Sequence, residues 1–341
     1  MRRCICSMVV LVMVMMCVDV WAQTVSGTVS MRFDLSAHGQ EQEAQLWIPY
    51  PTSNRYQTIT NIRIEGTSSS HGVYTDTTYQ TPVLYVRWDA GVKDRRLTFA
   101  FDVSRKDVVR RDFPAKETAW DPADYAIYLA PTRLGPIDGS VKKLADKITR
   151  GKTGVLEKAK AVYDWTCENT YRNPETRGCG PGDVCNLLSD PGGKCGDISS
   201  LFIALARAAG VPSREIFGIR QGKTEEQDIS TWQHCWAEFF LPGYGWVPVD
   251  PADVRKKMLV ENLSLDDAKT TEYREYFWGG IDPYRIKLSE GRDLKLNPAQ
   301  AGDPVNYLMY PFAQVGTQTI DWLDPANFSY EIKYKMASVH S

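Results

Sequence analysis

The chain has 341 residues, of which 43% are hydrophobic and 24% are charged, and its formal net charge is −2. These values are ordinary for a globular protein, and the length is sufficient for about two domains. The small net charge gives no electrostatic reason to expect nucleic acid or an anionic membrane surface as a partner, so we expect neither.

Residues 1–22 have the pattern of a secretory signal peptide. Two arginines precede an apolar run that ends at Val20, and the small residue Ala22 stands directly before Gln23. The run is shorter than the ~20 residues that a membrane span requires. We therefore expect cleavage after Ala22 and a periplasmic or secreted protein with no membrane contact beyond the signal peptide. The alternatives are an uncleaved anchor and a lipoprotein-type cut before Cys17.

Export would place the remaining cysteines in an oxidising compartment, where disulfides persist. The cysteines that follow the signal peptide are Cys167, Cys179, Cys185, Cys195 and Cys235. Their number is odd, so at least one thiol stays free in a monomer and needs an explanation. The sequence leaves open whether Cys167 and Cys235 pair.

Residues 23–105 have the alternating pattern of antiparallel strands. Apolar residues occupy every second position in 25–35 and in 97–103, with shorter runs of the same kind between them. Such alternation buries one face of each strand, which predicts an N-terminal antiparallel β-sandwich. Residues 106–136 are expected to form a linker with one short strand at 125–129.

A second unit, residues 137–256, is predicted to begin with helices, because apolar residues recur at helical spacing. A Gly- and Pro-rich loop follows, and then a helix begins within GGKCGDISSLFIALARAAGVP, residues 192–212. Cys195 thus lies at a helix N-terminus, where the dipole and free N–H groups lower the pKa of a thiol. The glycines around Cys195 would let a substrate backbone approach, and the N–H groups of Cys195 and Gly196 are candidate oxyanion donors.

The segment TWQHCWAEFFLPGYGWVPVDPAD, residues 231–253, predicts a strand, a turn and a second strand. His234 lies on the first strand and Asp250 ends the second. Antiparallel pairing can bring Asp250 beside His234, where a carboxylate would fix the imidazole tautomer. Asp253 is the competing carboxylate for this role.

These two segments resemble the transglutaminase-like superfamily of cysteine enzymes, which has a papain-like core. The family places its nucleophile in G-x-C-x-D at a helix start, its His in H-x-W-x-E and its Asp in G-W-x-x-x-D. The matching residues here are Cys195, His234 and Asp250, with Trp236, Glu238 and Trp246 as companions. The resemblance covers roughly residues 137–255 and implies a catalytic triad of nucleophile, base and orienting acid.

The loop cysteines Cys179 and Cys185 have C-x5-C spacing, and the chain has no C-x2-C pair to support a zinc site with Cys195 and His234. We therefore expect a Cys179–Cys185 disulfide, no metal and no cofactor. Calcium, on which animal transglutaminases depend, is not expected because no EF-hand loop is present. A structural role for Cys195, buried or in a disulfide, is the alternative to a nucleophile.

Aromatic residues near the motifs are candidates for the wall of a peptide groove, namely Trp232, Trp236 and Trp246. The resemblance also suggests an aromatic oxyanion donor, for which Trp165 and Tyr171 are the candidates. Residues 257–341 are expected to form a β-rich extension with a short helix, a hairpin turning at 290–292 and a final strand.

The predicted fold is α+β, with an N-terminal antiparallel β-sandwich followed by a papain-like, transglutaminase-like catalytic domain. The predicted function is cleavage of amide bonds in peptide or protein substrates, with water as the acyl acceptor. The alternatives are acyl transfer to an amine, as in a transglutaminase, and a non-catalytic peptide- or protein-binding module. The triad serves hydrolysis and transfer equally, and hydrolysis is preferred because no acceptor site can be read from the sequence.

Overall fold

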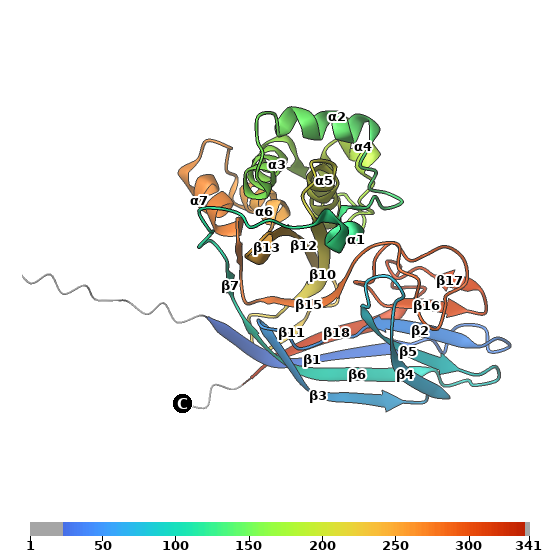
Figure 1. The fold of residues 1–341 in the computed structure, drawn as a ribbon. Coiled ribbons are helices and arrows are strands. Elements are labelled where there is room, and N and C mark those ends of the chain that lie inside the picture. Colours follow the sequence, from blue (N-terminus) through green and yellow to red (C-terminus); the bar gives the residue numbers. More distant parts are fainter. Residues whose placement is uncertain (1–22, 338–341) are drawn as a thin grey trace, which may run out of the picture.

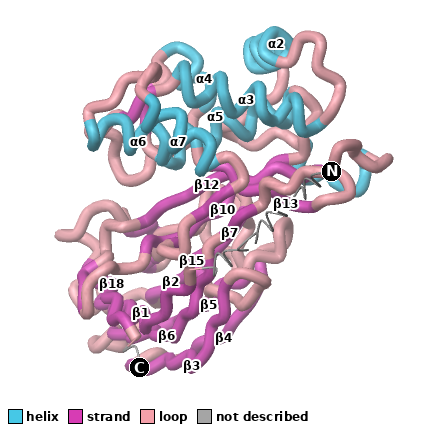
Figure 2. Tube along the Cα trace, turned by 90° about the vertical axis from the view of Figure 1, so that its left-hand side faces the viewer, coloured by secondary structure: helices cyan, strands magenta, loops and turns pink. Residues whose placement is uncertain are grey.

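The computed structural model describes residues 23–337, so the predicted signal peptide lies outside the described residues. Helices form one layer, a four-stranded sheet lies beneath them, and a β-sandwich forms the base (Figure 1). Figure 2 shows the same layers from the side, with the helices above the strands. The predicted α+β fold class is confirmed. No helix within residues 23–337 is long and apolar enough to cross a membrane.

The sandwich consists of two five-stranded sheets with strand orders β11-β18-β1-β6-β3 and β17-β16-β2-β5-β4. Its strands are β1 (Thr24–Asp34), β2 (Ala44–Pro49), β3 (Gln57–Gly66), β4 (Ser70–Thr75), β5 (Pro82–Trp88), β6 (Arg96–Lys106), β11 (Glu226–Asp228), β16 (Phe312–Val315), β17 (Gln318–Ile320) and β18 (Ser329–Met336). Strands from both ends of the chain therefore share each sheet. The division into a sandwich at 23–105 and an extension at 257–341 does not follow these layers.

Strand β1 lies at the centre of its sheet and shows why the sequence alternates. It pairs antiparallel with β6 and with β18, so that Val29 faces Phe101 on one neighbour and Tyr334 on the other. Every second side chain of β1 is buried in the space between the two sheets. This burial of one face is what the period-two pattern predicts.

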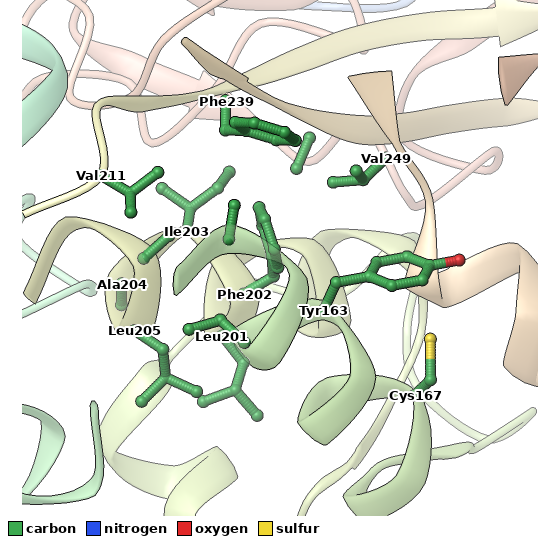
Figure 3. Close-up of a cluster of buried hydrophobic side chains, with 14 of the residues drawn as sticks. Tyr163, Cys167, Leu201, Phe202, Ile203, Ala204, Leu205, Val211, Phe239 and Val249 are labelled. Carbon is green, nitrogen blue, oxygen red and sulfur yellow. The ribbon is translucent and has the colours of Figure 1, made fainter. Parts of the chain in front are cut away.

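The second unit has a sheet of order β13-β12-β10-β15 covered by helices (Figure 1). Its main elements are α2 (Gly139–Ile148), α3 (Val155–Asn169), α4 (Val184–Ser189), α5 (Cys195–Ala208), β10 (Ser213–Arg220), β12 (Gln233–Leu241), β13 (Gly245–Val249), α6 (Pro251–Glu261), α7 (Ala268–Phe277) and β15 (Arg285–Glu290). All residues of α5 are buried, because this helix lies between the sheet and its neighbours. Figure 3 shows part of this core, where Phe202 of α5 lies below Phe239 of the sheet, Tyr163 of α3 lies to one side, and Leu201 lies farther from the sheet.

Four short strands and two short helices complete the described chain: β7 (Val108–Val109) pairs with β14 (Gly280–Ile281), β8 (Tyr171–Arg172) pairs with β9 (Gly192–Gly193), and η1 (Pro122–Tyr125) leads into α1 (Ala126–Leu129). The strand predicted at 125–129 is therefore wrong. Asp121 accepts a hydrogen bond from the backbone of Ala123 and starts a helical turn, with a proline at its first position.

The hairpin predicted at 290–292 is also wrong. After β15 the chain does not fold back onto it, and Leu294 instead forms an isolated bridge with Val305. Arg292, expected at the turn, is buried in an ion pair with Glu215, with 2.6 Å between Nε and Oε2. Strand β15 also contacts the sandwich, where the side chain of Gln57 accepts from and donates to the backbone of Lys287. The sandwich and the helix-covered sheet are therefore in direct contact through Gln57 and β15.

Candidate active site

Cys195 is the first residue of α5, and its side chain is 2% exposed. Its position at N1 leaves its backbone N–H without an intrahelical acceptor. The next amide, that of Gly196, donates to the carbonyl of Cys179 at 2.7 Å and is therefore engaged. The N–H of Gly196 is thus not available as an oxyanion donor. The N–H of Cys195 has no acceptor within the described residues.

His234 and Asp250 come from neighbouring strands, as the sequence predicts. Strands β12 and β13 pair with Ala237 opposite Val249, which carries Asp250 to the end of β13 and close to the start of β12. The Nε2 of His234 lies 2.7 Å from Oδ2 of Asp250. Because Nε2 is used by the carboxylate, the other ring nitrogen, Nδ1, is left for the thiol of Cys195.

Asp250 is held from three directions. It is the N-cap of α6, where its Oδ1 accepts from the backbone N–H of Asp253 at 2.8 Å. Its Oδ2 accepts from His234 and also from the guanidinium of Arg285. The side chain is 0% exposed, so neither oxygen depends on water for its partners. Such a carboxylate is fixed in orientation before any ligand arrives.

Three thiols converge at the start of α5. Cys179, Cys195 and Cys235 lie in one buried cluster, and the neighbouring side chains of Cys179, then of Cys235 and His234, lower the pKa of Cys195 well below its usual value. The thiol of Cys179 itself donates to the backbone carbonyl of Gln233 at 3.4 Å. The neighbouring Cys195, together with burial, raises the pKa of Cys179. These opposite shifts favour the thiolate form at Cys195 over Cys179, and His234 is among the groups that lower the pKa of Cys195.

The imidazole of His234 is set between opposing charges. Burial and the Arg220 charge lower its pKa, whereas the carboxylates of Asp253 and Asp250 raise it, and the net direction is upward. A raised imidazole pKa and a lowered thiol pKa both favour the pair of imidazolium and thiolate. This is the protonation state in which a cysteine is nucleophilic.

Arg285, on β15, is the residue that sequence reasoning missed. Its side chain is 0% exposed and contacts three carboxylates: Asp250, Asp253 with Nη2 at 2.7 Å, and Asp282 with Nε at 2.8 Å. Its Nη1 also lies 3.1 Å from Nε2 of His234. The residue lies 35 positions after Asp250, and no motif spacing connects the two.

The model of the transglutaminase-like superfamily matches residues 142–251, which contain Cys195, His234 and Asp250. An uncharacterised protein of Haemophilus influenzae is 35% identical over 318 residues, covering 86% of each chain. This chain belongs to the transglutaminase-like superfamily. A proposed cysteine protease from Cytophaga hutchinsonii has the same fold, with a TM-score of 0.54, 15% identity, and 92% of this chain and 99% of that chain covered. YebA of Bacillus subtilis is 28% identical over 125 residues, 33% of this chain and 17% of its own length.

The cysteines of the described chain are all free thiols. The expected Cys179–Cys185 disulfide is absent, because both thiols are free and Cys185 is exposed while Cys179 is buried beside Cys195. Cys167 is a free buried thiol in the core, where burial raises its pKa to about 12 (Figure 3). Cys235 is likewise free and buried.

The three tryptophans expected to wall a groove have other partners. Trp236 is buried with Ile216 on the face of β12 that also carries His234, and its ring centroid lies 6.4 Å from that of the imidazole. Trp232 packs against the sandwich core. Trp246 lies under the guanidinium of Arg214, whose Cζ is 4.1 Å from a ring centroid. The three tryptophans thus take part in internal packing. Arg214 also pairs with the motif residue Glu238.

The aromatic oxyanion candidates are also engaged elsewhere. Tyr171 donates its hydroxyl to Asp190 at 2.7 Å, and its side chain is among the exposed large hydrophobic groups. Trp165 packs on the helical core. The aromatic residues near Cys195 are instead Tyr307 and Tyr310, which belong to the same buried cluster, and Tyr310 donates to Sγ of Cys179 at 3.2 Å.

Asp197, the acid of the G-x-C-x-D motif, explains the glycines before Cys195. Its carboxylate accepts from the backbone of Gly182 at 2.9 Å and of Lys194 at 3.1 Å. A side chain on Gly193 would collide with it, since an added Cβ would lie 2.4 Å from its own Cβ. Gly193 therefore makes room for Asp197, whereas an added Cβ on Gly192 would lie 2.3 Å from the ring of Tyr171, so both glycines serve internal packing and not the approach of a substrate backbone. Burial raises the pKa of Asp197 to about 6.

His234, Asp250 and Asp253 offer ligand atoms close enough together to hold a metal ion. Both carboxylates already face guanidinium groups, because Arg285 contacts both and Arg220 lies 2.6 Å from Asp253. Two positive charges thus occupy the place of a cation, which does not fit a metal centre.

Proposed function

We propose that the protein is a cysteine-nucleophile enzyme that cleaves amide bonds of peptides or proteins. Membership of the transglutaminase-like superfamily supports a cysteine-type enzyme in general. The observation that carries the proposal is the 2.7 Å contact between Nε2 of His234 and Oδ2 of Asp250, which leaves Nδ1 for Cys195. The lowered pKa of the thiol supports the same assignment.

In the proposed reaction the thiolate of Cys195 attacks the carbonyl carbon of the amide. The amide C–N bond breaks as Nδ1–H of His234 gives its proton to the leaving nitrogen. A water molecule then attacks the thioester, gives a proton to His234 and releases the acid and the thiolate. Asp250 keeps the imidazole in its tautomer and stabilises its charged form throughout.

Hydrolysis is the preferred outcome over transfer to an amine. Cys195 is nearly closed off by the cluster that includes Tyr307 and Tyr310, so its surroundings favour a small acceptor such as water. Entry of the amide substrate requires the segment around these tyrosines to move. We also propose a periplasmic or secreted location, which follows from the pattern of residues 1–22. Intact-mass analysis of protein recovered from the periplasm should then show an N-terminus at Gln23.

Incubation of the protein with a proteome-derived peptide mixture, with and without a primary amine, tests the proposal. New peptide termini identify hydrolysis, and amine adducts on glutamine identify transfer. The Cys195→Ala variant is the matched control, because alanine suits a first helical position and leaves the helix intact. Equal spectra from both proteins would favour the non-catalytic binding module.

A further inference from the structure

Two positively charged side chains near Cys195 have no carboxylate partner. Within residues 23–337, neither Arg172 nor Lys256 forms an ion pair or a side-chain hydrogen bond, and both are half-buried. By contrast, Arg220 pairs with Asp253, and Lys257, the neighbour of Lys256, pairs with Glu261. Half-buried cations without a counter-charge are costly to hold, which points to a missing anion.

The chain topology brings both cations to the reactive cysteine. Strand β8 runs parallel to β9, and Arg172 pairs with Gly193, two residues before Cys195. Helix α6 starts at Asp250, contacts β8 and carries Lys256 on its second turn. Arg172 therefore lies on the strand that pairs with β9, just before Cys195. Lys256 lies on the helix that Asp250 caps.

Charge effects agree with this placement. Burial, then the charge of Arg220, lowers the pKa of Lys256, and the charge of Arg172 acts in the same direction, whereas the carboxylate of Asp253 raises it without forming an ion pair. A Cys195 thiolate likewise raises the pKa of Lys256. The charge of Arg172 also lowers the pKa of Cys179, which neighbours Cys195. Both cations thus act on the thiol cluster and on each other.

The acidic groups nearby are already committed. Asp250 and Asp253 are bound by His234 and by Arg285, and Asp197 accepts two backbone N–H groups. None of these carboxylates contacts Arg172 or Lys256 within the described residues. The described anions that act on Lys256 are Asp253, already paired with Arg220 and Arg285, and the Cys195 thiolate, so a bound carboxylate would supply the two cations with a counter-charge of their own.

We propose that Arg172 and Lys256 form a subsite for a carboxylate of the substrate, so that the enzyme prefers acidic peptides with a carboxyl group close to the reacting amide. This inference rests on the proposed function, in which Cys195 is the nucleophile. The subsite selects the substrate and holds it beside the thiol, whereas the triad performs the chemistry. Arginine suits this role through its planar pair of donors, and lysine adds a point charge.

The test compares two alkylating reagents of the same size, iodoacetate and iodoacetamide, which differ in a carboxylate. The rate at which each reagent modifies Cys195 is followed by peptide mapping. The iodoacetate rate is divided by the iodoacetamide rate, and this ratio is divided by the same ratio measured for glutathione at the same pH. The ratio should fall by about threefold to tenfold in Lys256→Gln and in Arg172→Gln, as expected for removal of one charge near the thiol. It should fall further in the double variant.

Lys257→Gln is the matched control on the same helix, and its ratio should equal that of the wild type, because Lys257 is paired with Glu261. A ratio that changes as much in Lys257→Gln as in Lys256→Gln, or that changes in neither, overturns the subsite. The iodoacetamide rate alone reports the nucleophile. If Cys195 reacts with neither reagent, the nucleophile is wrong and the subsite fails with it, whereas normal iodoacetamide reactivity with an unchanged ratio overturns the subsite only.

Discussion

Replacement of Arg285 by glutamine should both destabilise the protein and shift the titration of its active site. Arg285 contacts Asp250, Asp253 and Asp282 without exposure to solvent. Breaking a buried ion pair by removing one partner costs about 3–5 kcal/mol, because an uncompensated charge remains. Asp253 would keep Arg220, and Asp282 is 25% exposed, so Asp250 bears the main loss.

We therefore expect the free energy of unfolding to fall by about 3 kcal/mol, the cost of one broken buried pair and not of three. With an m-value of about 3 kcal/mol/M, the urea midpoint should fall by about 1 M. Arg285 also lowers the pKa of His234, so its removal should raise that pKa further. The imidazolium–thiolate pair should then persist to higher pH, as measured by the pH dependence of iodoacetamide alkylation at Cys195.

Arg214→Gln provides the control, because Arg214 is also largely buried and paired with Glu238 but does not contact His234. It should lose stability with an unchanged alkylation profile. Arg285→Lys should recover part of the charge but not the three-way contact. If Arg285→Gln unfolds at the wild-type urea concentration and titrates like the wild type, Arg285 does not hold the site.

Three further predictions concern the site itself. Cys179→Ala should raise the pKa of Cys195, because the neighbouring Cys179 side chain is the first cause of its lowering; an unchanged alkylation profile would contradict this. The folded pKa of Asp197, about 6, exceeds its unfolded value of about 3.8. Its contribution to stability is therefore present below pH 3.8 and declines as pH rises to 6, by up to about 3 kcal/mol. Asp197→Asn should remove this decline from urea unfolding measured across that range. Cys195→Ala should abolish turnover and Cys195→Ser and His234→Ala nearly so, whereas Asp250→Asn should retain more activity, by about two orders of magnitude in kcat; full activity of Cys195→Ala would refute the nucleophile.

The sequence was informative where chemistry and local periodicity coincide. The G-x-C-x-D segment marks the start of α5, the H-x-W-x-E segment lies within β12, and a single hairpin joins His234 to Asp250, so short-range spacing predicts that His234 and Asp250 lie close together. The family match over residues 142–251 and the similarity to a solved structure confirm the predicted transglutaminase-like fold. The roles of Cys195, His234 and Asp250 stay predictions until the variants are measured.

What the sequence did not reveal depends on long-range pairing. Arg285 reaches Asp250 because β15 joins the edge of the sheet beside β10, a pairing that no local pattern encodes. Proximity in the chain predicts that Cys179 pairs with Cys185, yet the carbonyl of Cys179 accepts a hydrogen bond from Gly196, and its thiol lies in the cluster at the start of α5. Trp236 and Cys235 are consecutive on β12 and therefore point to opposite faces of the sheet. The alternation alone does not tell which layer of the protein covers each face.

The pairing of β1 with β18 has a consequence for the order of assembly. Gly27 lies opposite Met336, so the first described strand of the chain, which also pairs with β6, finds its second neighbour only in the last strand. Closing so large a loop is slow and entropically unfavourable until many other contacts exist. Tyr310, which covers the thiol cluster, lies in the same late portion of the chain. A nascent or C-terminally truncated polypeptide therefore has no sealed cysteine pocket, and the mature thiol environment arises only after synthesis is complete.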